Sequence, residues 1–91
     1  MYKIEITQRA NKELDKIKKG NEKIALKIEI FLSEVLSNET NPRELSNATK
    51  LKGYNDKYRW RIGDYRIIGI IKDDILTIEI IKISTRQGAY K

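Results

Sequence analysis

Cysteine and histidine are both absent from the 91-residue chain, and proline occurs only once. Without cysteine the protein has no disulfide, no thiolate nucleophile and no thiolate metal site. Without histidine it also lacks the commonest general acid–base residue and the commonest zinc ligand. Any chemistry must therefore use lysine, arginine, tyrosine and carboxylate side chains, and we predict neither a metal ion nor an organic cofactor.

Long apolar runs are missing as well. No stretch approaches the ~18 consecutive apolar residues of a membrane-spanning helix, and residues 1–5 do not resemble a signal peptide. We therefore expect a cytoplasmic protein without a membrane partner. With 40% apolar and 35% charged residues, the composition is that of one small folded domain over residues 1–91.

Acidic residues are scarce in the second half of the chain. Residues 1–49 contain nine lysines and arginines against eight aspartates and glutamates, whereas residues 50–91 contain ten against five. A local excess of positive charge is typical of a surface that binds the phosphate backbone of a nucleic acid. An acidic protein partner would satisfy the same charge equally well.

The N-terminal residues alternate between apolar and polar side chains. We predict a strand over residues 2–6, with Tyr2, Ile4 and Ile6 pointing inward. A helix over residues 8–19 follows, because Thr7 is a suitable N-cap and Gly20 a suitable stop.

A second helix begins directly after the first, with Asn21 as its N-cap. Its apolar residues recur at helical spacing and predict one buried side: Ile24, Ile28, Phe31, Leu32, Val35 and Leu36. Since about two residues join the helices, they are expected to form an antiparallel hairpin. Residues 38–47, which include Pro42, are expected to be a polar connection to the rest of the chain.

Three further strands are predicted near residues 57–62, 65–72 and 75–83, with turns at residues 63–64 and 73–74. The resulting order is β-α-α-β-β-β. It predicts an α+β fold in which the helical hairpin packs on one face of a small, mainly antiparallel sheet.

The turn at Gly63-Asp64 suits a two-residue hairpin loop with a positive φ at the glycine. In that register Arg61 lies opposite Arg66, and alternation places both, with Arg59, on one solvent-facing side. The apolar side is shared by Tyr58, Trp60, Ile62, Tyr65 and Ile67. Like charges directly opposite one another destabilise a sheet by roughly 0.2–1 kcal/mol, so we infer an anionic ligand for the arginines.

Two of these features also have a purely structural interpretation. Glu79, on a neighbouring strand, would neutralise Arg59 or Arg66 in a surface ion pair. Trp60 has the phase of a core residue packed against the helices rather than that of a base-stacking residue.

Several motifs together resemble the RelE/ParE superfamily of toxins from type II toxin–antitoxin systems. They are the order of elements, the Leu51-Lys52-Gly53 turn, the hairpin at residues 58–66 and the ending Arg86-Gln87-Gly88-Ala89-Tyr90. The resemblance covers nearly the whole chain. The basic pair that flanks Trp60 and the Arg-x-x-x-Tyr ending are more similar to the RelE branch than to the gyrase-directed ParE branch.

This resemblance implies a RelE-like microbial ribonuclease fold and a ribosome-dependent endoribonuclease that cleaves messenger RNA and so inhibits translation. It also implies three partners: a cognate antitoxin protein, the ribosome and the messenger RNA. A hetero-oligomer of toxin and antitoxin is the expected inactive form.

The resemblance further implies the residues of the site. The catalytic residues would be Arg59, Arg61, Arg66, Arg86 and Tyr90, and the RNA-binding residues would be Lys50, Lys52 and Lys57. Arg66 would stabilise the transition state, Arg86 would lie near the leaving group, and Tyr90 would stack on or orient a base. Guanidinium groups suit this reaction, because metal-free RNA cleavage uses the 2′-hydroxyl of the RNA as its nucleophile and leaves charge stabilisation to the protein.

The identity of the general base stays open. Arginine, with a pKa above roughly 12, is a poor general base, and Thr85 stands where many relatives carry a histidine. Proton transfer would then fall to Lys52, Lys57, Tyr90 or a ribosomal group, or the rate would come from electrostatics alone. Two alternatives to the ribonuclease are a ParE-like, non-enzymatic inhibitor of DNA gyrase and a catalytically weak RNA-binding relative.

Overall fold

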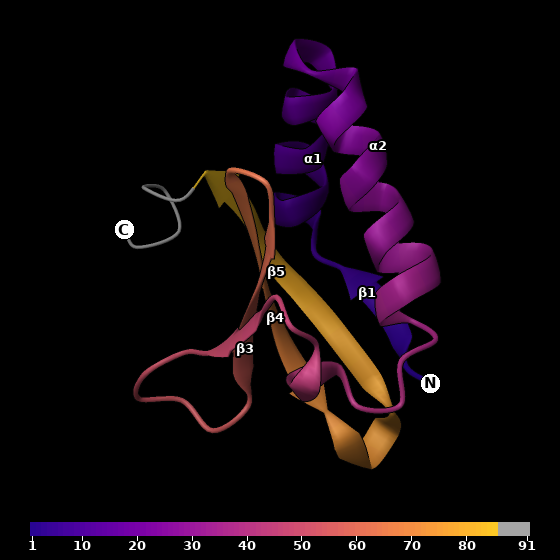
Figure 1. The fold of residues 1–91 in the computed structure, drawn as a ribbon, viewed down its shortest axis with the longest axis vertical. Coiled ribbons are helices and arrows are strands. Elements are labelled where there is room, and N and C mark those ends of the chain that lie inside the picture. Colours follow the sequence, from indigo (N-terminus) through magenta and orange to yellow (C-terminus); the bar gives the residue numbers. More distant parts are fainter. Residues whose placement is uncertain (86–91) are drawn as a thin grey trace.

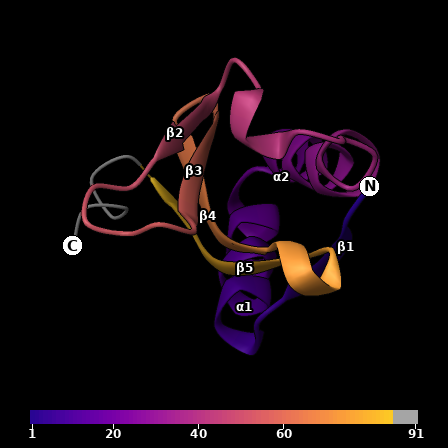
Figure 2. The same ribbon diagram turned by 90° about the horizontal axis from the view of Figure 1, so that it is seen from below.

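The computed structural model describes residues 1–85, which form a five-stranded sheet with two helices packed on one of its faces (Figures 1 and 2). The strands are β1 (Lys3–Ile6), β2 (Ala48–Lys50), β3 (Lys57–Ile62), β4 (Tyr65–Lys72) and β5 (Thr77–Thr85). The helices are α1 (Gln8–Gly20) and α2 (Glu22–Ile30). The predicted α+β class is confirmed. Within the described residues, neither helix is long and apolar enough to cross a lipid bilayer.

The strand order in the sheet is β1-β5-β4-β3-β2. Only β1 and β5 run parallel, and the other neighbours are antiparallel, as predicted. The short edge strand β2 was not predicted. Three residues are too few to show an alternating pattern, and β2 exists because its backbone pairs with β3.

Local signals set both helix starts. The Thr7 side chain accepts a hydrogen bond from the backbone N–H of Ala10 (3.1 Å), and the Asn21 side chain accepts one from that of Ile24 (3.2 Å). Each cap satisfies a backbone donor that the first turn of a helix leaves without a partner. The two helices form the predicted antiparallel hairpin, visible side by side in Figure 1.

The core lies between the helices and the sheet. Its fully buried members include Ala25, Ile28, Leu36, Trp60, Ile67, Ile78 and Ile80. Trp60 is completely buried, and its indole N–H donates a hydrogen bond to the carbonyl oxygen of Pro42 (3.1 Å). This confirms that Trp60 is a core residue rather than a base-stacking one.

Two residues predicted to point inward are exposed. Val35 follows α2 in a wider π-type turn (Phe31–Leu36), in which the N–H of Ser37 donates to the carbonyl of Leu32 (3.3 Å). This hydrogen bond spans five residues instead of the four of an α-helix, so the turn is wider. Leu32 and Leu36 stay buried, but Val35 is rotated outward and is 41% exposed. Ile6 is 39% exposed because it ends the edge strand β1.

The last strand starts later than predicted. Asp73–Ile75 form a 3-10 turn, and Leu76 adopts a left-handed conformation (φ 47°), so β5 begins at Thr77 rather than at residue 75. It then runs to Thr85, two residues beyond the predicted end. An irregularity at Ile68/Gly69 interrupts its pairing with β4.

Candidate nucleic-acid interface

The hairpin of β3 and β4 has the predicted register. Arg61 lies opposite Arg66, Arg59 opposite Ile68, and Trp60 opposite Ile67. The turn glycine, Gly63, has a φ of 57°, which a residue with a Cβ rarely adopts. The register therefore places all three arginines on the sheet face opposite the helices.

Their exposure differs from the prediction in one case. Arg61 is exposed and Arg59 is half-buried, but Arg66 is only 7% exposed. The Nη1 group of Arg66 donates hydrogen bonds to the backbone carbonyls of Gly63 and Tyr65 (both 3.1 Å). The prediction that Arg66 points toward solvent is wrong, because these two carbonyls draw its guanidinium back onto the hairpin.

A groove of about 740 Å³ lies on the same face of the sheet, beside the loop between β2 and β3. Six cationic residues line it: Arg9, Lys50, Lys52, Lys57, Arg59 and Lys82. No carboxylate is among its lining residues within the described chain. Apolar side chains of Leu51, Ile68 and Ile81 also contribute to the lining. The groove thus combines apolar surface with positive charge.

The groove brings together part of the predicted site. Lys50, Lys52, Lys57 and Arg59, which were predicted as site residues, line it. Within the described residues, Arg61 and Arg66 are not among its lining residues. Arg86 and Tyr90 lie outside the described residues.

Among the lining residues that were not predicted as site residues, Arg9, Tyr54 and Lys82 carry a charged or aromatic side chain. Ile68 on β4 pairs with Arg59 on β3 and with Lys82 on β5. The strand register therefore places Lys82 and Arg59 on either side of Ile68, in one row across the sheet. The bulge in β5 hides this relationship from sequence alone. No motif in the sequence indicates that Arg9 belongs to the groove. Arg9 reaches the groove because Thr7, at the start of α1, donates its backbone N–H to Ile80 of β5 (3.0 Å).

Glu79 is paired away from the groove. Its carboxylate lies 3.6 Å from the ammonium of Lys72, near the end of β4. Both side chains are partly exposed, so this ion pair adds little to stability.

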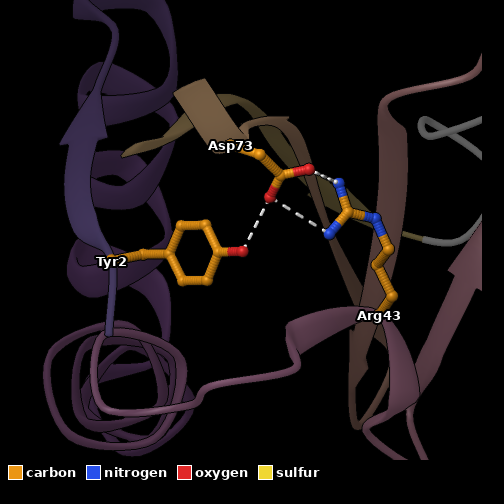
Figure 3. A network of polar contacts seen from close by, with 3 residues as sticks. All are labelled: Tyr2, Arg43 and Asp73. Carbon is orange, nitrogen blue, oxygen red and sulfur yellow. Dashed lines mark hydrogen bonds and ion pairs between the residues drawn. The ribbon is translucent and has the colours of Figure 1, made fainter. Parts of the chain in front are cut away.

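A separate polar network joins Tyr2, the residue before β1, to the turn before β5 (Figure 3). The carboxylate of Asp73 accepts hydrogen bonds from Arg43 (Nη2, 2.7 Å) and from the hydroxyl of Tyr2 (2.7 Å). The two donors hold the pKa of Asp73 below its ordinary value, Arg43 having the larger effect. The bond to the carboxylate raises the pKa of the Tyr2 hydroxyl.

Arg43 also lies over the ring of Tyr58, 5.7 Å from its centroid. It therefore connects the Asp73 network to β3, the strand that carries Arg59 and Arg61. The network is outside the groove, and its geometry is that of a structural tie rather than a ligand site.

Fold and groove together define a class of protein: a small basic α+β domain whose sheet offers an extended, cationic groove suited to an anionic chain. A family model described as "ParE toxin of type II toxin-antitoxin system, parDE" matches residues 4–90. The chain therefore belongs to the RelE/ParE superfamily and is a toxin of a type II toxin–antitoxin system. The predicted family is confirmed.

Individual relatives agree with this assignment. The chain is 37% identical over 90 residues to "Putative toxin RelE1" of Methanocaldococcus jannaschii, covering 99% of this chain and 96% of the relative. The archaeal RelE–RelB complex of Pyrococcus horikoshii OT3 contains a chain that is 31% identical, with a TM-score of 0.68 and coverage of 93% and 94%. The RelB–RelE complex of Methanococcus jannaschii gives 26% identity, a TM-score of 0.74 and coverage of 94% for both chains.

Proposed function

We propose that this toxin is a ribosome-dependent endoribonuclease that cleaves messenger RNA without a metal ion. The observation that carries the proposal is the groove with six cationic and no acidic lining residues in the described chain. Such a surface attracts the phosphates of an RNA strand over several nucleotides. The similarity to archaeal proteins named RelE supports the RelE branch of the superfamily, for which the sequence resemblance implies this activity.

The proposed reaction uses the RNA as its own nucleophile. The 2′-oxygen attacks the adjacent phosphorus while the bond from phosphorus to the 5′-oxygen breaks, which leaves a 2′,3′-cyclic phosphate and a 5′-hydroxyl. One proton leaves the 2′-hydroxyl for a base and another reaches the departing 5′-oxygen from an acid. The cationic side chains stabilise the additional negative charge on the phosphate oxygens.

Roles follow from position and chemistry. Arg59, in the groove, and the exposed Arg61 are proposed to contact the scissile phosphate. Lys52 and Lys57 line the groove and, unlike arginine, carry an amine that can act as a base once it is deprotonated. Lys50 is proposed to hold the RNA backbone. Arg86 and Tyr90 are proposed to have the catalytic roles that the family motif implies, whereas Arg66 is proposed to hold the hairpin in shape, because its guanidinium donates to the carbonyls of Gly63 and Tyr65.

The test is induced expression in cells that lack the antitoxin, followed by mapping of RNA 5′ ends. We expect cuts within the codons of translated messages, and we expect them to disappear when translation initiation is blocked. The double variant Arg59→Ala/Arg61→Ala should abolish the cuts. Lys23→Ala/Lys27→Ala, on helix α2, removes the same charge away from the groove and should retain them. Cuts that persist in the arginine variant would contradict the proposed roles.

A second candidate function is supported by the family model itself, whose description names ParE. In that case the protein inhibits DNA gyrase without cleaving RNA. Growth arrest with intact messages and an induced DNA-damage response would favour this candidate over the ribonuclease.

An antitoxin is the proposed protein partner. The similar structures from Pyrococcus horikoshii and Methanococcus jannaschii are both complexes of RelE with RelB. An antitoxin segment with acidic side chains would complement the groove of this chain, and its binding should weaken as the salt concentration rises.

A further inference from the structure

Tyr54 is an aromatic side chain in the groove that the proposed reaction does not use. It lies in the loop between β2 and β3, directly after the turn at Lys52-Gly53. Its backbone N–H donates to the carbonyl of Leu51 (3.3 Å), and Gly53 has a φ of 87°. The tight turn therefore fixes the position of the Tyr54 backbone, from which the side chain extends.

The Tyr54 ring is held but not buried. The ammonium of Lys57 lies 4.1 Å from the ring centroid, while 48% of the residue is exposed. A cation over a ring face is an attractive contact that limits the motion of the ring. Restricting the ring in advance lowers the entropic cost of binding a second flat group to it.

The surroundings of Tyr54 indicate which group that is. The lining of the groove includes Leu51, Ile68 and Ile81, and its charged side chains are all cationic within the described residues. A nucleotide of a single strand offers a flat apolar base and an anionic phosphate, so it matches both parts of this surface. A duplex keeps its base faces stacked inside and would leave the apolar lining and the ring unused.

We propose that Tyr54 stacks on an unpaired base of single-stranded RNA bound in the groove. The proposal rests on the proposed ribonuclease function and adds to it a residue that recognises the base rather than the phosphate. The phenol hydroxyl is not required, because stacking uses the face of the ring.

The test compares two probes that differ only in their bases. One is a fluorescently labelled hexamer of 2′-O-methyl RNA, which lacks the nucleophile and is not cleaved. The other is an abasic hexamer with the same backbone. Binding of the full chain is measured by anisotropy for wild type, Tyr54→Ala, Tyr54→Phe and Lys82→Ala, with circular dichroism to show that each variant is folded.

We expect Tyr54→Ala to weaken binding of the base-containing hexamer roughly tenfold or more and to leave binding of the abasic hexamer unchanged. Tyr54→Phe should bind both probes as wild type does. Lys82→Ala should weaken binding of both probes by the same factor, since it removes a phosphate contact.

Three results would overturn the inference. If Tyr54→Ala binds both probes like wild type while Lys82→Ala weakens both, the groove binds RNA but Tyr54 does not stack. If Tyr54→Ala weakens both probes equally, Tyr54 only positions Lys57. If wild type binds neither probe, the groove does not bind free single-stranded RNA and the inference fails, whereas the proposed ribosome-dependent cleavage is decided separately by the mapping of RNA 5′ ends in cells.

Discussion

Gly69 on β4 leaves the space that the Trp60 ring occupies. A Cβ built on Gly69 would lie 3.0 Å from Cζ3 of Trp60, and 3.1 Å and 3.2 Å from the side chains of Ile80 and Ile78. Contacts of 3.0–3.4 Å are tighter than nine in ten real Cβ contacts, so a neighbouring side chain would have to move by a few tenths of an ångström. Because Trp60 is fully buried and hydrogen-bonded to Pro42, it has little room to move. The missing side chain at position 69 thus permits a tryptophan in the middle of the sheet.

Gly69→Ala is therefore expected to lower the free energy of unfolding by about 1–3 kcal/mol, as overpacking of a core does. Urea unfolding followed by Trp60 fluorescence measures the change. Gly20→Ala is the matched control, since nothing lies within 4 Å of a Cβ there. We expect the control to be neutral or slightly stabilising. Equal losses in both variants would contradict the packing explanation.

Arg66→Ala is expected to destabilise the protein by about 1–3 kcal/mol, because the carbonyls of Gly63 and Tyr65 lose their donor. Arg61→Ala, at the exposed position opposite, should change stability by less than about 0.5 kcal/mol. Thermal unfolding of both variants provides the comparison. An Arg66→Ala protein as stable as Arg61→Ala would show that the guanidinium is not part of the hairpin structure. A loss of toxicity in Arg66→Ala has to be interpreted together with this measurement.

The Asp73 network predicts a pH-dependent contribution to stability. The pKa of Asp73 lies below its ordinary value of 3.8 because Arg43 and Tyr2 donate hydrogen bonds to the ionised carboxylate. The stabilisation is therefore fully present above the ordinary value and is lost as the pH falls through the lowered pKa.

Asp73→Asn is accordingly expected to be less stable than wild type at pH 7, with the difference shrinking as the pH is lowered below about 3.8. Unfolding in urea across a pH series measures this difference. Asp74→Asn, at the neighbouring exposed position, is the control and should leave stability unchanged. A difference for Asp73→Asn that is independent of pH would exclude the carboxylate as its source.

Leu76→Gly is expected to stabilise the protein by up to about 1 kcal/mol. Leu76 is held at φ 47° and ψ 49°, a left-handed conformation that costs a residue with a side chain roughly 1–2 kcal/mol. Leu76 is 57% exposed, so its removal loses little burial. Ile75→Gly is the control, because Ile75 is similarly exposed (58%) but lies in the 3-10 turn. A decrease in melting temperature for both variants would contradict the strain argument.

The hairpin of β3 and β4 was predictable because its information is local. Gly63-Asp64 specifies a two-residue turn, and that turn length fixes which residues face each other on both strands. Thr7 and Asn21 were identified as caps for the same reason, since a cap and its partner are three residues apart.

The groove required the tertiary structure. Arg9 from α1 and Lys82 from β5 join Lys50 and Arg59 only after the sheet has assembled in the order β1-β5-β4-β3-β2. The bulge in β5 shifts which of its residues lies beside Ile68. Neither the sheet order nor the bulge has a pattern within any one segment of the chain.

The sequence by itself determined both helices, four of the five strands and the register of the arginine hairpin, because turns, caps and alternation act over a few neighbouring residues. Its motifs also carried the resemblance to a toxin family. Only the tertiary structure decided which charged side chains are exposed and which of them lie together. It drew Arg66 back onto the carbonyls of its own hairpin, added β2 to the edge of the sheet and placed Tyr54 and Lys82 in one groove. Burial and groove shape depend on contacts between distant segments, and such contacts exist only in the folded chain.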